Sequence, residues 1–326
     1  MQKKYFPGAN SGEGFFSRFS GVVPPWEKSH YTYVLKGGPG VGKNTLMKKA
    51  AKRALDKGYE VEEFRCASDP KSLDAIRITD IGVVILDGTS PHSIDPVLPG
   101  IGDEIVDLGH FKNKKAFAES RDALVKLFCE NKRYYNAAYA MLSAACTLKR
   151  EALSAMRDAV NLHKLNSLLE RLINAKAGKK RELFACSATP DGVIDFSPSF
   201  LSDNTVKFSG IVGEIALIEA ARILDNKQCS MFYGFADPRV PHCLSFGETA
   251  LALDDDGDSL NVMCSGNTPA HVGFCLDKAE HLIKRATSEL SKALAVHDEI
   301  EKIYREYVDY DRVNEEGENL LRQIGV

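Results

Sequence analysis

A glycine-rich stretch followed by a lysine lies near the N-terminus. It reads LKGGPGVGKNTL over residues 35–46. Glycines let a backbone wrap closely around phosphate so that its N–H groups point inward, and the lysine then reaches the β- and γ-phosphates. The sequence therefore predicts a site for a nucleoside triphosphate, with ATP as the expected ligand, formed by Gly38, Pro39, Gly40, Val41, Gly42, Lys43, Asn44 and Thr45.

Asp87 is the second group with a predicted chemical role. It ends the apolar run GVVILD, 44 residues after Lys43. A carboxylate at the end of a buried strand beside such a loop is typical of Mg²⁺ binding. Asn44 stands where Ser or Thr is usual, and its carbonyl oxygen is the second expected ligand of Mg²⁺. Replacing Asn44 by Ser is then expected to raise turnover or tighten the Mg²⁺ dependence, with Lys43 and Asp87 as the catalytic pair.

Four further polar residues lie in loops expected at the carboxyl ends of strands, where α/β sheets bind ligands. They are expected to contact a substrate or to support the site, and they are Asp69, Thr89, His92 and Asp95. His92 is equally compatible with a structural role in a proline-rich loop. No feature distinguishes a cation for the γ-phosphate among Arg65, Arg77, Arg133 and Arg239.

A strand, a turn and a helix are expected to position the phosphate-binding residues. YTYVL (31–35) is β-branched and aromatic, which is typical of a buried strand. A helical pattern begins at Lys43 and continues through TLMKKAAKRAL, with an apolar side. This is the local structure that a phosphate-binding loop requires.

The same plan recurs later in the chain. Val41-Gly42 is repeated as Val212-Gly213, Asp69-Pro70 as Asp237-Pro238, and Leu86-Asp87 as Leu253-Asp254, at similar offsets and in the same order. SGEGFFS (11–17) is likewise matched with DGVIDFS (191–197). We therefore expect an α/β fold with a sheet of the P-loop NTPase type, duplicated in tandem.

The second copy is expected to have lost the phosphate site. Glu214 aligns with Lys43, the loop is one residue shorter when counted from Gly210, and Ile215 and Ala216 replace Asn44 and Thr45. A carboxylate beside a triphosphate is electrostatically unfavourable. The second copy is therefore predicted to be structural or regulatory.

Each copy is followed by a helical segment. Residues 111–176 and 274–316 contain neither Gly nor Pro. A single helix over the first segment would be roughly 100 Å long, so we expect it to fold back as a hairpin. The expected domains are 1–178, a nucleotide-binding domain with a hairpin at about 110–177, and 179–326, the degenerate repeat with C-terminal helices. These helices could pack the copies together or bind a partner.

Composition narrows the class of protein. The chain of 326 residues has 44% hydrophobic residues and a net charge of −3, so no basic field favours nucleic acid or an anionic membrane. No apolar run is long enough to span a bilayer. Eight scattered cysteines without a CxxC pair favour reduced thiols and a cytoplasmic location. The oligomeric state and any protein or small-molecule partner are left open.

The combined motifs resemble those of a family of poorly characterised bacterial P-loop ATP-binding proteins or ATPases. That family has LKGGPGxGKSTLMKK, CxSDxxSLD and LDGTxPHxxDP, and this chain matches them at 35–49, 66–74 (CASDPKSLD) and 86–96 (LDGTSPHSIDP). The resemblance implies a cytoplasmic α/β fold with ATP as ligand, but no specific reaction. The chain departs from it at Asn44 and in its weaker second loop.

Three functions remain open at this point. The first is a slow Mg²⁺-dependent ATPase, in which conformational change passes to the second copy. The second is a kinase acting on a nucleotide or small molecule, with the SDP and DGTSPH loops as the acceptor pocket. The third is a switch that binds ATP with negligible turnover.

Overall fold

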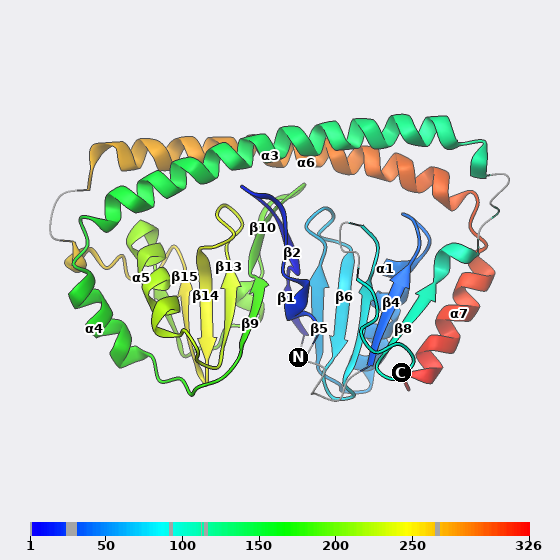
Figure 1. The fold of residues 1–326 in the computed structure, drawn as a ribbon, viewed down its shortest axis with the longest axis horizontal. Helices are drawn as coiled ribbons and strands as arrows, with labels where there is room; N and C mark the ends of the chain where they lie inside the picture. Colours follow the sequence, from blue (N-terminus) through cyan, green and yellow to red (C-terminus); the bar gives the residue numbers. More distant parts are fainter. Residues whose placement is uncertain (1, 24–30, 91–93, 112, 114–116, 265–267) are drawn as a thin grey trace. The chain divides into compact units, whose positions relative to one another are not determined.

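The computed structural model describes residues 2–23, 31–90, 94–111, 113, 117–264 and 268–326, and it forms two compact units. Unit 1 consists of residues 1–7, 22–136 and 289–326, and unit 2 of residues 8–21 and 137–288. Figure 1 gives the element labels used below. These units do not follow the expected division at residue 178, because each unit contains segments from both sides of it.

Unit 1 is built on a six-stranded mixed sheet with the order β1-β5-β6-β7-β4-β8. The pairs β1/β5, β4/β7 and β4/β8 are parallel, whereas β5/β6 and β6/β7 are antiparallel. The strands are β1 (Gln2–Tyr5), β4 (Tyr31–Lys36), β5 (Val61–Arg65), β6 (Leu73–Ile78), β7 (Val83–Asp87) and β8 (Asp103–Asp107). A short 3-10 turn, η2 (Leu108–His110), follows β8.

The core of unit 1 lies between this sheet and two helices, α1 (Lys43–Asp56) and α7 (Tyr310–Gln323). The apolar side of α1, which includes Met47 and Ala50, packs in one cluster with Ile76 and Ile85 of the sheet. Leu320 of α7 joins the same cluster. The predicted helix at Lys43 is therefore confirmed, and its covering helix comes from the far end of the chain.

Unit 2 contains a five-stranded sheet, β12-β15-β14-β13-β9, and a four-stranded sheet, β11-β10-β2-β3. The strands of the first are β9 (Lys180–Phe184), β12 (Thr205–Phe208), β13 (Cys229–Tyr233), β14 (Pro241–Phe246) and β15 (Thr249–Leu253). Those of the second are β2 (Gly8–Ser11), β3 (Gly14–Ser17), β10 (Cys186–Thr189) and β11 (Gly192–Asp195). Short 3-10 turns follow at η1 (Phe19–Gly21), η3 (Ser197–Ser199) and η4 (Asn261–Met263).

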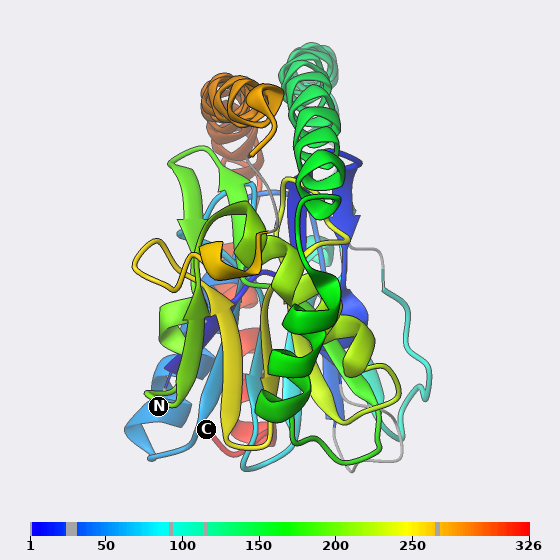
Figure 2. The same cartoon turned by 90° about the vertical axis from the view of Figure 1, so that its left-hand side faces the viewer.

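In unit 2, α5 (Gly210–Ile223) packs against the larger sheet, and α4 (Leu162–Leu172) packs against α5. Figure 2 shows α4 and α5 side by side. Ile215 and Ala216 of α5 are buried, as are Leu165 and Leu169 of α4. The apolar residues that replace Asn44 and Thr45 in the sequence alignment are thus core residues.

The two larger sheets share one topology. In unit 2, β9/β13 and β12/β15 are parallel and β13/β14 and β14/β15 antiparallel, so β9-β13-β14-β15-β12 repeats the order and directions of β1-β5-β6-β7-β4. The covering helices are exchanged: α4 follows the first repeat in sequence but packs in unit 2, and α7 follows the second repeat but packs in unit 1. This exchange is why the units differ from the expected domains.

The helical segments differ from the predicted hairpin. The first forms one helix of 37 residues, α3 (Arg121–Arg157), before the short α4, and the second forms one of 36 residues, α6 (Ala270–Arg305), before α7. Each contributes residues to both units. Within the part of the chain that the structure describes, no helix has the length and apolarity needed to cross a bilayer. The predicted α/β class is confirmed, and the sheets are mixed, which the sequence did not predict.

Candidate functional site

Six residues, Gly37–Gly42, connect β4 to α1. Together with the start of the helix as far as Thr45, they are called the glycine loop here. Gly40 and Gly42 have φ of 71° and 102°, a left-handed conformation that residues with a Cβ adopt only with strain. Gly42 is the N-cap of α1, and its carbonyl accepts the hydrogen bond of Leu46 N (3.0 Å). The loop thus turns sharply and leaves the N–H groups of the first helical turn without side-chain caps.

The ammonium group of Lys43 reaches back across the loop. Its Nζ donates to the carbonyl oxygens of Gly37 and Gly38, the second at 3.0 Å, and lies 3.5 Å from Asp87 Oδ2. Only 8% of Lys43 is exposed. Burial lowers the pKa of Lys43 below its usual value, and the nearby carboxylates of Asp87 and Glu301 oppose that shift. A positive charge held over a turn of N–H groups is suited to an anionic ligand.

Asp87 ends β7 beside β4, as predicted. Its Oδ1 accepts two hydrogen bonds from Thr89, from the backbone N (2.9 Å) and from the hydroxyl (2.6 Å). Lys36, the last residue of β4, donates to the carbonyls of Gly88 (2.7 Å) and Ile94 (2.9 Å). The loop after β7 is thereby held against the end of β4, which fixes Asp87 next to Lys43.

Asn44 makes two hydrogen bonds that the sequence did not predict. Its Oδ1 accepts the hydrogen bond of Leu73 N (3.1 Å), and its Nδ2 donates to Ser72 Oγ (3.1 Å). Ser72 in turn donates to Asp69, which also accepts from Lys71 N (3.1 Å). Asn44 thus joins the first turn of α1 to the β5–β6 connection. A serine side chain is too short to make both contacts.

The donors present fit Mg²⁺ only in part. Asp87 supplies one carboxylate at the glycine loop, and Mg²⁺ bound with a nucleotide commonly takes one or two carboxylates together with phosphate oxygens and water. Asn44 Oδ1 accepts from Leu73 N and Asp87 Oδ1 accepts from Thr89, so both predicted ligands also hold their own loops. Among the described residues no cluster of three or more His, Cys, Asp or Glu side chains could hold a metal by itself.

The remaining predicted residues differ in how close the structure brings them to Lys43 and Asp87. Thr45 is exposed on α1, and Asp69 is engaged within its own turn. Asp95, whose side chain is 90% exposed, lies 3.7 Å from Lys36 Nζ. His92 lies outside the described residues. Of the three that the structure describes, Asp69, Thr89 and Asp95, only Thr89 hydrogen-bonds to Asp87.

Residues from the C-terminal part of the chain contact the glycine loop, and sequence reasoning missed them. The Tyr304 ring lies against Gly38, where any Cβ would collide with it. Tyr310 donates from its hydroxyl to the Gly40 carbonyl (2.7 Å). A Cβ on Gly40 would lie 3.1 Å from the Glu301 carbonyl and 3.5 Å from Arg305 Nε. No local motif marks these residues, because they are more than 260 positions away from the loop.

The corresponding junction of unit 2 has no such loop. A single residue, Ser209, separates β12 from α5, so the expected shortening by one residue underestimates the loss. Gly213 packs so closely that its Cβ would lie 3.0 Å from Phe208 Cβ, and a Cβ on Gly257 would lie 2.6 Å from Phe208 C. Backbone therefore fills the space that the loop would enclose.

Glu214 is the fifth residue of α5, whereas Lys43 is the first of α1, so the two are not structurally equivalent. Glu214 pairs with Lys149 of α3 at 2.7 Å. Burial would lower the pKa of Lys149, but Glu214 raises it above its usual value. Asp237, matched in sequence with Asp69, accepts from both Nε (2.5 Å) and a terminal nitrogen (3.0 Å) of Arg150. These charges are paired within unit 2.

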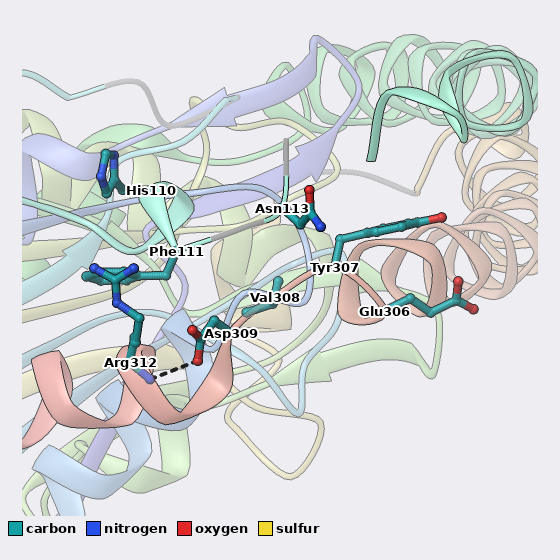
Figure 3. Close-up of a pocket in the computed structure, with 8 residues that line it drawn as sticks. All are labelled: His110, Phe111, Asn113, Glu306, Tyr307, Val308, Asp309 and Arg312. Atoms are coloured by element: carbon teal, nitrogen blue, oxygen red, sulfur yellow. Dashed lines mark hydrogen bonds between the residues drawn. The ribbon is translucent and has the colours of Figure 1, made fainter. Parts of the chain in front are cut away.

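A pocket of about 560 Å³ lies in unit 1, and its lining residues are His110, Phe111, Asn113, Glu306, Tyr307, Val308, Asp309 and Arg312 (Figure 3). The Arg312 guanidinium lies over the Phe111 ring, 4.9 Å from its centroid. Comparisons with known proteins add nothing to this geometry: no family model, no curated protein and no solved structure matches the chain.

Proposed function

We propose that the chain binds a nucleoside triphosphate, with ATP as the first candidate, together with Mg²⁺ at the glycine loop and hydrolyses it slowly. The observation that carries this proposal is the position of Lys43, whose Nζ spans the loop onto two carbonyls and lies 3.5 Å from Asp87. Mg²⁺ bound with the nucleotide would neutralise phosphate charge, and Asp87 is the residue that would hold it.

We also infer that the two units descend from a tandem duplication in which only the first kept a P-loop NTPase-type site. The shared strand order and strand directions of the two sheets support this, and so do the matched 3-10 turns and helices. The cysteines, all eight of which are free, support the predicted cytoplasmic location.

A non-catalytic switch is the second candidate, because one observation favours it. Tyr304 and Tyr310 contact Gly38 and Gly40, so a ligand that moves the loop would also move the junction of α6 and α7. ATP binding without turnover would then be read out at the C-terminal helices. The two functions share the same loop and differ only in hydrolysis.

Phosphate release from purified protein with ATP and Mg²⁺ tests the first candidate, with Lys43→Ala as the decisive variant. Removing the loop lysine should lower the rate by at least about 100-fold, because its charge acts on the phosphates in the transition state. Lys49→Ala is the matched control, since Lys49 lies on the same helix and pairs with Glu318 away from the loop. Wild-type release no faster than that of Lys43→Ala would refute the ATPase, and nucleotide binding without release would leave the switch.

A further inference from the structure

The pocket of Figure 3 is joined to the glycine loop through both of its walls. On one side, Gly109 lies two residues before Phe111, and its N would be 3.0 Å from a Cβ on Gly37. On the other side, Tyr310 lies next to the lining residue Asp309, and its hydroxyl donates to the Gly40 carbonyl. A ligand whose phosphates occupy the loop would therefore have its remaining part within reach of the pocket.

The two walls are also fastened to each other. Asp309 N donates to the Phe111 carbonyl (2.9 Å), and Asn113 N donates to the Tyr307 carbonyl (3.0 Å). Asp309 Oδ1 caps α7 by accepting from Arg312 N (3.2 Å), the bond drawn dashed in Figure 3. These bonds hold the lining residues in place, some at the start of α7 and others on backbone segments that are hydrogen-bonded to each other. The pocket is therefore formed without a ligand.

The lining chemistry differs from that of the loop. Phe111 and the Arg312 guanidinium stack at 4.9 Å, and the His110 ring meets Phe111 edge-on at 5.9 Å. Flat aromatic and guanidinium faces are the surfaces on which nucleic-acid bases stack, whatever the base. A volume of about 560 Å³ is within the range of small-molecule sites.

Two carboxylate residues belong to the lining of the pocket, Asp309 near Arg312 and Glu306, whose side chain extends away from Phe111 and Arg312 (Figure 3). Both residues are exposed. Carboxylates repel phosphate but accept hydrogen bonds from ribose hydroxyls, as they do in dinucleotide-binding folds. The pocket is therefore suited to the uncharged end of a nucleotide and unsuited to a second phosphate chain.

We infer that this pocket receives the base and ribose of the nucleotide, with Phe111 and Arg312 stacking on the base and Asp309 accepting from the ribose. The inference rests on the proposed function, since the loop must hold the phosphates. It makes a separate claim, because it concerns the part of the ligand that inorganic tripolyphosphate lacks.

Calorimetric titration with ATP and, separately, with inorganic tripolyphosphate tests it, both in the presence of Mg²⁺. Phe111→Ala should weaken ATP binding by about ten-fold or more, the loss expected for one stacking partner, and leave tripolyphosphate binding unchanged. Arg312→Ala should act in the same direction and serves if the first variant does not fold. Phe128→Ala is the matched control, because its side chain is exposed on α3 and away from the pocket.

The outcomes separate the two claims. If wild type binds both ligands, Lys43→Ala binds neither, and the pocket variants bind ATP as wild type does, the inference is wrong and the proposed function stands. Equal weakening of ATP and tripolyphosphate would also overturn the inference, because the effect would then lie at the loop. If wild type binds neither ligand, both claims fail.

Discussion

The junctions β4–α1 in unit 1 and β12–α5 in unit 2 occupy the same place in sheets that share five strands in the same order and directions, yet only the first has the glycine-rich connection that we propose binds phosphate. In the first, six residues with left-handed glycines connect strand and helix, and Lys43 reaches back over them. In the second, one residue connects strand and helix, and Gly213 and Gly257 close on Phe208. Sheet topology therefore does not make a phosphate site. The site depends on the length and conformation of one connection.

The two junctions also differ in how closely their charged side chains are paired. In unit 1, the side chain of Lys43 is held by backbone carbonyls and lies 3.5 Å from Asp87, so its charge is only loosely paired. In unit 2, Glu214 and Asp237 have close partners in Lys149 and Arg150. Paired charges stabilise a fold but leave little field for a ligand. We therefore expect functional effects from unit 1 and effects on stability from unit 2.

Among the variants that compare the two units, Asp87→Asn should have the largest effect, because it removes the charge while preserving the shape of the side chain. Phosphate release should fall about 100-fold and require more Mg²⁺, because a carboxylate at this position is the expected metal ligand. The matched variant is Asp254→Asn, just after β15 in unit 2, where the carboxylate pairs with Lys207 at 2.8 Å. Equal losses in both variants, measured by phosphate release across a Mg²⁺ titration, would remove the distinction between the units.

Lys149→Met should act on stability alone. It leaves the mostly buried Glu214 carboxylate without its partner at 2.7 Å, so the free energy of unfolding should fall by about 1–2 kcal/mol in urea titrations. Adding Glu214→Leu should restore most of the loss, and nucleotide binding should not change. A weakened affinity for ATP in the single variant would show that unit 2 takes part in the site.

Asn44→Ser distinguishes two roles of Asn44, the hydrogen bonds that join α1 to the β5–β6 connection and the predicted binding of Mg²⁺. Loss of the bond to Leu73 N leaves a donor at a buried residue unpaired, which should lower the free energy of unfolding by about 1 kcal/mol. Ser72→Ala, which removes the other partner of the same amide, should destabilise in the same direction. Faster hydrolysis by Asn44→Ser at unchanged stability would instead return Asn44 to the metal role expected from its position in the motif.

The parts of the site that depend on adjacent residues were predictable from the sequence. The strand at 31–35, the helix from Lys43 and the strand ending at Asp87 follow from periodicity and motif spacing. The partners of Asn44 were not, because Ser72 lies 28 residues away across a turn whose pairing no pattern specifies. The contacts of Tyr304 and Tyr310 with the glycine loop could not be predicted either, because these residues are still farther from the loop in the sequence.

The sequence and the structure match the two halves of the chain in different registers. The sequence match of 11–17 with 191–197 places Gly12 opposite Gly192. In the structure, Ser11 Oγ donates to the Gly14 carbonyl (2.7 Å) in one hairpin, and Thr189 Oγ1 donates to the Gly192 carbonyl (2.8 Å) in the other, so Gly14 matches Gly192. The sequence alignment rests on identical residues, whereas the structural alignment rests on the geometry of the turns. Ser11 and Thr189 make the same hydrogen bond in their turns although they differ in residue type.

Amide hydrogen exchange with and without ATP and Mg²⁺ tests the central claim most directly, because it reports on both junctions in one experiment. Backbone N–H groups that bind phosphate become protected from exchange. The account predicts added protection at residues 38–45 and none at residues 208–214, and Lys43→Ala should abolish it. Protection at 208–214, or none at 38–45 at saturating ATP, would contradict the assignment of the glycine loop as the nucleotide site.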